Sequence, residues 1–258
     1  MAIESIIAAL EPGYYRINLP AAVSDSMHGE MTVFELNTVR VRDRAGAEGV
    51  GYTFTCGRNG AAIDAILTRD IAGLVIGEDG DRIERLWQKV WWATHYGGRG
   101  GPTVLALSAV DMALWDLKAV RLGQPLWRLL GGHDPRVPCY AGGIDLDYPL
   151  DRLLRQTEDN LSKGFRAIKM KVGRARLSED VERVAAMRDF LGTDFPLMVD
   201  ANMKWTADEA IRAARAFAPH AIGWLEEPII PDDVAGHVRI VREGGVPGGP
   251  RRDIPTRR

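Results

Sequence analysis

The 258-residue chain is poor in cysteine: Cys56 and Cys139 lie far apart and form no CxxC pair. Two cysteines exclude a disulfide-stapled scaffold and are typical of a reducing compartment, and we interpret both as buried, unreactive thiols. Apolar runs long enough to span a membrane are also lacking. The first residues, MAIESIIAAL, have neither the basic segment nor the cleavage site of a signal peptide. We therefore expect a cytoplasmic protein with no membrane contact.

An excess of charge of one sign is lacking as well. The formal net charge is −2, which gives no electrostatic basis for binding nucleic acid. The four arginines within residues 248–258 have no aromatic side chains between them and are weak evidence for such a partner. We therefore expect the chain to bind a small molecule and no nucleic acid.

The first half of the chain predicts a small mixed domain. Three stretches rich in β-branched and aromatic residues predict an antiparallel meander, with strands at 14–19, 31–41 and 48–55. Three stretches with apolar residues at three- and four-residue spacing predict helices at 61–77, 81–92 and 102–123.

The second half repeats a strand and a helix four times. The predicted strands are 137–143, 167–172, 196–201 and 221–228, and the helices that follow lie near 149–163, 178–190, 206–217 and 232–243. Units of this length predict parallel strands joined by crossover helices. Either a doubly wound sheet or a (β/α) barrel fits the pattern. No Gly-rich phosphate loop follows the first strand, so a dinucleotide-binding domain is the least favoured interpretation.

Polar side chains collect where three of these strands end. Lys169 and Lys171 end the second strand, Asp200 and Asn202 the third, and Glu226 the fourth. The two lysines are two residues apart and therefore leave a strand from the same face. Asp200 follows Lys171 by 29 residues and Glu226 follows Asp200 by 26, about one β-α unit each. Because the carboxyl ends of the strands build the active site of a (β/α) barrel, we expect these side chains around one mouth.

These residue types suit proton abstraction beside a metal ion. Asp200 and Glu226 on neighbouring strands form the oxygen-rich site that Mg²⁺ prefers. Each lysine disfavours protonation of the other, so one can be neutral near pH 7 and act as a base. The metal would stabilise the enediolate that forms when an α-proton leaves a carboxylate. Taken alone, a Lys-x-Lys pair is more often a solvated strand face, but the combination at one-unit spacing reverses that preference.

The segments KMKVG, MVDAN, WLEEP and SAVDMALWDLK, at these spacings, resemble the mandelate racemase group of the enolase superfamily. The resemblance implies an α/β plus α+β fold. An N-terminal α+β capping domain, residues 1–125, is followed by a truncated (β/α) TIM-type barrel of about four β-α units, residues 126–247. Full-length relatives are expected to be homo-oligomers.

The resemblance also implies roles for the residues at the strand ends. Lys171 corresponds to the base that takes the α-proton, and Lys169 to the residue that tunes this base and contacts the substrate carboxylate. Asp200 and Glu226 correspond to Mg²⁺ ligands. Asn202 would lie beside the metal and contact the substrate.

Three further segments, DSMHGEMTVFEL, HYGGRGG and CYAGGIDL, resemble a narrower branch, the 3,6-anhydro-L-galactonate cycloisomerases and related acid-sugar dehydratases. Loops of the capping domain set specificity in that branch, which makes His28 a candidate substrate contact. The branch implies an Mg²⁺-dependent enzyme that abstracts the α-proton of a sugar-derived carboxylate and completes a cycloisomerisation or dehydration. A racemase or epimerase is the alternative.

The family pattern ends near Pro247. A third metal-binding carboxylate would lie one unit beyond Glu226, where the chain has Arg252 within an atypical Gly-, Pro- and Arg-rich tail, residues 248–258. We expect that the reading frame has slipped or been cut there. Four strands cannot close a barrel, so we also expect poor solubility and little turnover. A catalytically inactive fragment is the alternative from another functional class.

Overall fold

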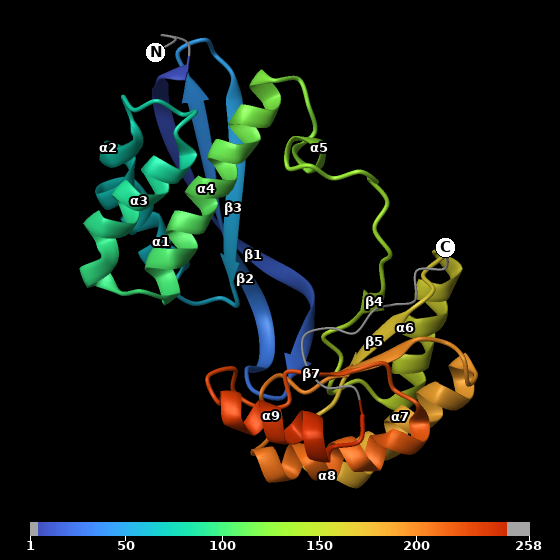
Figure 1. Cartoon of the computed structure of the whole chain (residues 1–258). Coiled ribbons are helices and arrows are strands. Elements are labelled where there is room, and N and C mark those ends of the chain that lie inside the picture. The colour runs from blue at the N-terminus through green and yellow to red at the C-terminus, as the bar shows by residue number, and fades with distance from the viewer. Residues whose placement is uncertain (1–4, 247–258) are drawn as a thin grey trace. The chain divides into compact units, whose positions relative to one another are not determined.

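A computed structural model describes residues 5–246 of the chain. The chain divides into two units (Figure 1). The first unit runs to Ala21 and continues over Thr32–Arg136, and the second combines Ala22–Met31 with the residues from Val137 onward. The domain bounds predicted at residues 125 and 247 stay predictions, and the tail 248–258 lies outside the described residues.

The first unit contains a three-stranded sheet in the order β1-β2-β3. Its strands are β1 (Ile7–Asp25), β2 (Gly29–Asp43) and β3 (Glu48–Thr55). β2 and β3 pair antiparallel, as predicted. β1 is much longer than the predicted 14–19 because its start is held in the core, where Ile7 and Leu10 are buried.

Helices cover this sheet. The predicted helix 61–77 is a continuous run of α1 (Gly60–Ala65), the π-helical η2 (Ile66–Ile71) and α2 (Ala72–Val75). It is followed by α3 (Ile83–Thr94), the 3-10 turn η3 (His95–Gly97), α4 (Gly101–Arg121) and the unpredicted short α5 (Leu126–Leu129). α4 packs on β3 and buries an apolar stripe that includes Ala109, Ala113 and Leu117.

The second unit contains a parallel sheet whose strands lie in chain order, β4-β5-β6-β7. They are β4 (Ala141–Gly142), β5 (Ile168–Lys171), β6 (Leu197–Asp200) and β7 (Leu225–Glu226). The helices between and after them are α6 (Leu150–Ser162), α7 (Leu177–Leu191), α8 (Ala207–Phe217) with the 3-10 turn η4 (Ala218–His220), and α9 (Val234–Glu243).

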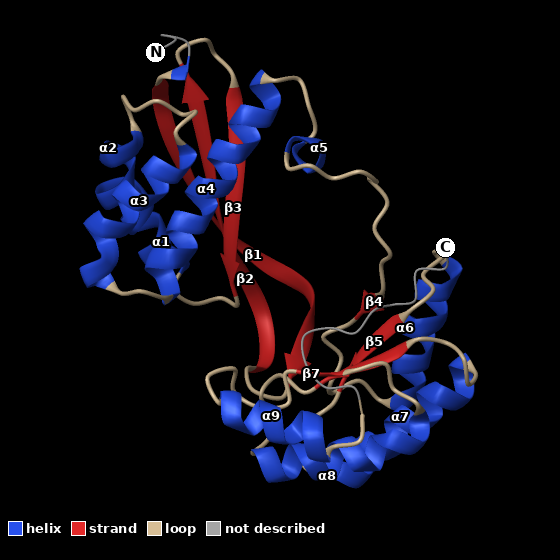
Figure 2. Ribbon diagram, viewed as in Figure 1, coloured by secondary structure: helices blue, strands red, loops and turns tan. Residues whose placement is uncertain are grey.

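The helices of the second unit lie along one side of its sheet (Figure 2). A doubly wound sheet has helices on both faces and a reversal in strand order, so the described sheet is singly wound. Its core joins strand residues such as Met170 and Val199 to Val184 of α7 and Phe217 of α8. A capping box stands at the start of α8: the Thr206 hydroxyl accepts from the Glu209 N–H, and the Glu209 carboxylate accepts from the Thr206 N–H.

The structure corrects two sequence-based expectations. β4 and β7 have two residues each, far fewer than the predicted 137–143 and 221–228. Cys56 and Cys139 are exposed, so the prediction of buried thiols is wrong. Within residues 5–246, no helix is both long enough and apolar enough to span a bilayer.

Candidate active site

The parallel register brings three of the predicted side chains to one edge of the sheet. Lys171 is paired with Asp200 across β5 and β6, and Asp200 with Glu226 across β6 and β7. Each is the last residue of its strand. The 29- and 26-residue spacings therefore correspond to single steps from strand to strand, and the side chains share the carboxyl end of the sheet, where (β/α) enzymes build their sites.

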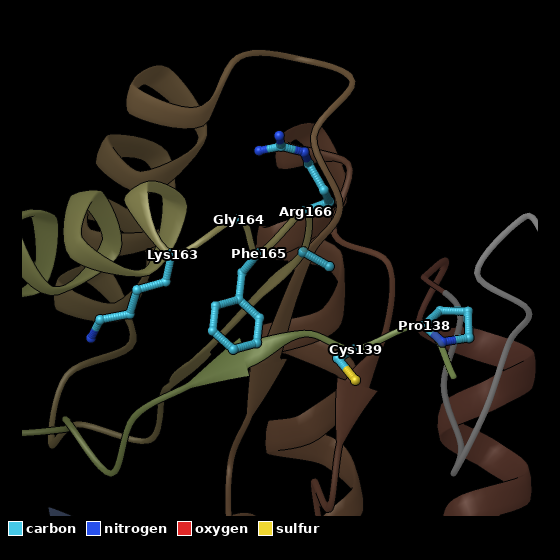
Figure 3. A pocket seen from close by; sticks show the side chains of 7 residues that line it. Pro138, Cys139, Lys163, Gly164, Phe165 and Arg166 are labelled. Carbon is cyan, nitrogen blue, oxygen red and sulfur yellow. The ribbon is translucent and has the colours of Figure 1, made fainter. Parts of the chain in front are cut away.

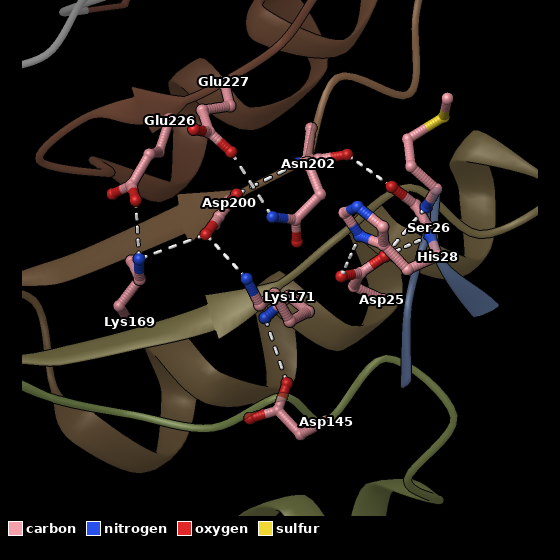
Figure 4. Close-up of polar contacts among 12 residues, drawn as sticks. Asp25, Ser26, His28, Asp145, Lys169, Lys171, Asp200, Asn202, Glu226 and Glu227 are labelled. Atoms are coloured by element: carbon pink, nitrogen blue, oxygen red, sulfur yellow. Dashed lines mark hydrogen bonds and ion pairs between the residues drawn. The ribbon is translucent and has the colours of Figure 1, made fainter. Parts of the chain in front are cut away.

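Two lysines and two carboxylates meet there in direct contact (Figure 4). Lys169 Nζ donates to Asp200 Oδ2 at 3.1 Å and to Glu226 Oε1 at 2.6 Å, so it bridges the two acids. Lys171 Nζ donates to the same Asp200 oxygen at 2.7 Å. The side chains of Lys171 and Asp200 are only 9% and 3% exposed. We call these four residues the lysine–carboxylate cluster.

The charges of this cluster shift the pKa values of two of its members. Burial lowers the pKa of Lys169, but the hydrogen bond to Glu226 and the charge of Asp200 outweigh it, so the net pKa is raised well above the usual lysine value. Burial likewise raises the pKa of Asp200, but the hydrogen bond and charge of Lys171 outweigh it and hold the net pKa below the usual range. Lys169 is therefore held charged, because the carboxylates overcome the repulsion between the two ammonium groups.

The cluster has the donor set of a hard cation. An ammonium group already lies between Asp200 Oδ2 and Glu226 Oε1, which places a positive charge within hydrogen-bonding distance of both oxygens. Glu226 Oε2 is held in place by the Trp224 indole N–H at 2.9 Å. Within the described residues, no group of three or more His, Cys, Asp and Glu side chains is arranged to hold a metal ion. Among the described residues, the cluster therefore offers a hard cation such as Mg²⁺ two carboxylates, Asp200 and Glu226.

Asn202 lies directly after β6 with an unusual backbone. Its φ is +45°, in the left-handed region that asparagine tolerates better than most residues. This turn lets its N–H donate to Asp200 Oδ1 at 3.0 Å. Its side-chain Nδ2 approaches Glu227 Oε2 at 3.4 Å, while its Oδ1 is buried without a hydrogen-bond partner. A buried acceptor that lacks a donor is costly, which makes this oxygen a candidate contact for a ligand.

His28 reaches the same end of the sheet through the connection between β1 and β2 (Figure 4). Its Nδ1 lies 2.8 Å from Asp25 Oδ2, and its side chain is half-exposed. Burial raises the pKa of Asp25, but hydrogen bonds from the backbone N–H and ring of His28 and from the Met27 N–H outweigh it and leave the pKa below its usual range. Ser26 anchors this connection, because its hydroxyl donates to the carbonyl of Ala201 just beyond β6.

Asp145 was missed as a site residue, although it lies in the segment CYAGGIDL. Its carboxylate is buried and accepts from the backbone N–H of Lys171 at 3.0 Å. The rule that selected the other residues, a polar side chain shortly after a strand of the β-α series, also applies to this aspartate after β4. The prediction of a strand as far as residue 143 left its position relative to Lys171 undefined.

A separate pocket of about 460 Å³ lies at the other end of the strands (Figure 3). Its lining residues precede β4 and β5 in the chain: Pro138, Cys139 and Lys163–Ala167. Because the lysine–carboxylate cluster is at the carboxyl ends of the same strands, this pocket does not contain it.

Comparisons with known proteins identify the family of this chain. Residues 16–131 match the mandelate racemase / muconate lactonizing enzyme N-terminal domain, and residues 152–247 match the enolase C-terminal domain-like family. The 3,6-anhydro-alpha-L-galactonate cycloisomerase of Streptomyces coelicolor is 56% identical over 240 residues, which are 93% of this chain and 66% of that protein. The L-talarate/galactarate dehydratase of Salmonella typhimurium is 40% identical over 81% of this chain and 53% of its own length.

A solved structure is similar to this chain in both sequence and fold. The crystal structure of a racemase from Streptomyces coelicolor with bound magnesium has a TM-score of 0.92 at 56% identity and covers 95% of this chain and 69% of that one. The present chain spans about two thirds or less of the two curated relatives. The two domain matches and the identity over the shared length confirm the resemblance seen in the sequence: the chain belongs to the mandelate racemase and muconate lactonizing enzyme group of the enolase superfamily.

Proposed function

We propose that this chain carries the proton-abstracting residues of an acid-sugar cycloisomerase or dehydratase, with Lys171 as the base. The observation that carries the proposal is the shared contact at Asp200 Oδ2, where Lys171 Nζ and Lys169 Nζ meet at 2.7 and 3.1 Å. A base and a cation-binding carboxylate on neighbouring strands are the two elements needed to remove a weakly acidic α-proton from a carboxylate.

Each residue of the site has a distinct task in this proposal. Lys171 Nζ receives the α-proton, and Lys169, held charged, donates to the substrate carboxylate. Asn202 and His28 contact the substrate hydroxyl groups. Asp200 and Glu226 would hold Mg²⁺, and the bound ion would supply Lewis-acid stabilisation of the negative charge that develops on the substrate carboxylate.

The relatives support an acid-sugar substrate. One is named a 3,6-anhydro-alpha-L-galactonate cycloisomerase and another an L-talarate/galactarate dehydratase. We therefore propose cycloisomerisation or dehydration of a sugar-derived carboxylate. Racemisation or epimerisation is a second candidate, favoured by the similarity to a structure described as a racemase.

We further propose that the singly wound sheet of the second unit is part of a (β/α) barrel within the predicted bounds 126–247, which follows a capping domain at 1–125 in the sequence. The described residues provide two carboxylates at the cluster, and they contain no third His, Cys, Asp or Glu arranged with them. We therefore expect weak Mg²⁺ binding and low turnover from this chain by itself. Homo-oligomerisation of longer relatives, a cytoplasmic location and the change of reading frame near Pro247 stay predictions.

The test is exchange of the substrate α-proton with solvent. The chain is incubated in D₂O with Mg²⁺ and either galactarate or 3,6-anhydro-L-galactonate, and loss of the α-proton signal is followed by ¹H NMR. We expect slow exchange that Lys171→Met abolishes, while Lys163→Met, an exposed lysine at the end of α6, leaves it unchanged. Equal rates in the chain and in Lys171→Met refute the assignment of the base.

A catalytically inactive fragment is the candidate function from another class, and the two-carboxylate cluster favours it. Absence of exchange at saturating Mg²⁺ and substrate, together with absence of Mg²⁺ binding by calorimetry, would support this alternative. Mg²⁺ binding without exchange would keep the metal assignment and reject Lys171 as a functioning base in this chain.

A further inference from the structure

The backbone N–H of Lys171 donates to a side-chain carboxylate, at a position where a neighbouring strand would normally offer a backbone carbonyl. The pairing of β4 with β5 ends at Gly142↔Lys169. Beyond it, the N–H of Lys171 donates to Asp145 Oδ1 at 3.0 Å (Figure 4). On the other side of β5, the N–H of Val172 donates to the backbone carbonyl of Asp200 at 2.9 Å. The end of β5 is therefore held on one side by a backbone ladder and on the other by a side chain.

Arg183 of α7 completes this arrangement. Its Nη1 donates to the carbonyl of Lys171 at 2.9 Å, and its Nη2 donates to the carbonyl of Asp145 at 3.1 Å. The second oxygen of Asp145 accepts from Gln156 Nε2 at 2.9 Å. A Cβ on Gly143 would collide with this oxygen, so the glycine leaves room for the carboxylate. Both backbone polar groups of Lys171 are thus bonded to side chains.

Holding the end of β5 with buried charged side chains carries a desolvation cost. Asp145 is 1% exposed and Arg183 is 5% exposed. A buried charge destabilises the fold unless it is paired and hydrogen-bonded, whereas a longer β4 would satisfy the same N–H with a neutral carbonyl. The planar guanidinium and the carboxylate instead give bonds of fixed direction, which restrict where the backbone of Lys171 can lie.

The segment that carries Asp145 also holds the connection that bears His28. The N–H of Ser24 donates to the Ile144 carbonyl, and the N–H of Leu146 donates to the Ser24 carbonyl, both at 3.2 Å. Asp145 therefore lies between two hydrogen-bonded neighbours, the His28-bearing connection and the end of β5.

We propose that Asp145 and Arg183 are positioning residues, which fix Lys171 relative to the segment that carries His28. Their relevance to catalysis rests on the proposed role of Lys171 as the base. A base displaced by about 1 Å can lose on the order of a hundredfold in rate, so a rigid attachment of its backbone has a direct chemical consequence.

The test measures amide hydrogen exchange of the full chain by NMR, with Lys171 and Val172 as a matched pair. In Asp145→Ala, we expect the Lys171 amide to exchange about tenfold faster, since it loses its only acceptor among the described contacts, while the Val172 amide changes by less than about twofold. Asp145→Asn retains an acceptor oxygen and should restore protection at Lys171. Arg183→Lys replaces the planar two-nitrogen fork of the guanidinium with a single ammonium group and should give an intermediate effect, whereas Asp147→Ala, at an exposed neighbour, should give none.

The outcomes separate positioning from a general structural role. Equal acceleration at Lys171 and Val172 in Asp145→Ala, or no acceleration at Lys171, overturns the proposal. If Asp145→Ala does not fold, Arg183→Lys decides: wild-type protection at Lys171 in that variant overturns the proposal. The α-proton exchange assay is run on the same samples. Selective loss of Lys171 protection without any substrate exchange in the parent chain rejects the proposed function and leaves the positioning role intact.

Discussion

The lysine–carboxylate cluster leads to a testable competition between Lys169 and Mg²⁺. In the structure the Lys169 ammonium donates to Asp200 Oδ2 and Glu226 Oε1, the oxygens that would bind the metal. Lys169→Met removes this cation and keeps most of the side-chain volume. We expect the variant to be less stable without Mg²⁺ and to bind Mg²⁺ more tightly than the parent chain.

The contacts set the size of the effect. A hydrogen bond to a charged group contributes about 1.5–3 kcal/mol, and two such bonds are lost. Asp200 keeps the bonds from Lys171 and the Asn202 N–H, and Glu226 keeps the bond from Trp224, so neither acid is left without a donor. We therefore expect the low end of that range, about 1.5 kcal/mol. In the parent chain, Mg²⁺ has to displace the hydrogen bonds of Lys169, and in Lys169→Met it does not. A difference of about 1.5 kcal/mol corresponds to roughly tenfold tighter Mg²⁺ binding.

Urea denaturation at pH 7 with increasing Mg²⁺ measures both quantities. A ligand at ten times its dissociation constant raises the free energy of unfolding by about 1.4 kcal/mol, so the Mg²⁺ concentration that produces this shift reports the affinity. Glu226→Gln should abolish the Mg²⁺ response, and Lys163→Met should behave like the parent chain. A Lys169→Met variant that responds to Mg²⁺ no more strongly than the parent would refute the placement of the cation between Asp200 and Glu226.

Three further outcomes are expected. The pKa of Asp200 is lower in the folded than in the unfolded chain, so its pairing contributes stability above about pH 4 that is lost as the pH falls through the folded pKa; urea midpoints between pH 3 and 7 should fall on acidification less steeply in Asp200→Asn, and an unchanged slope would contradict this. Thr206→Ala breaks the capping box of α8 and should lower the free energy of unfolding by about 1 kcal/mol, with Thr206→Ser as the control that keeps the hydroxyl. Phe217→Ala opens a cavity in the core of the second unit and should cost about 3–5 kcal/mol in the same assay, whereas a loss below 1 kcal/mol would mean that the side chain is not packed as described.

The sequence determined the series of elements because their signals are local. Helix starts and ends depend on caps and on the apolar period. The predicted helix 206–217 therefore differs from α8 by one residue at its start, and the predicted helix 178–190 differs from α7 by one residue at each end. The regular length of the β-α units likewise indicated that Lys171, Asp200 and Glu226 lie one unit apart. Once parallel strands follow in chain order, that spacing is enough to bring the three side chains to one edge.

The tertiary structure decided what depends on partners distant in the chain. β4 and β7 form ladder hydrogen bonds with their neighbouring strands over only two residues each. Packing in the core of the first unit extends β1 back to Ile7. The carboxylates around Lys169 reverse the effect expected from two adjacent ammonium groups, because electrostatic energy depends on every charge within a few ångströms, whichever part of the chain supplies it. The bond from Lys171 to Asp145 joins residues 26 positions apart, a distance in sequence over which composition and periodicity carry no information about contact.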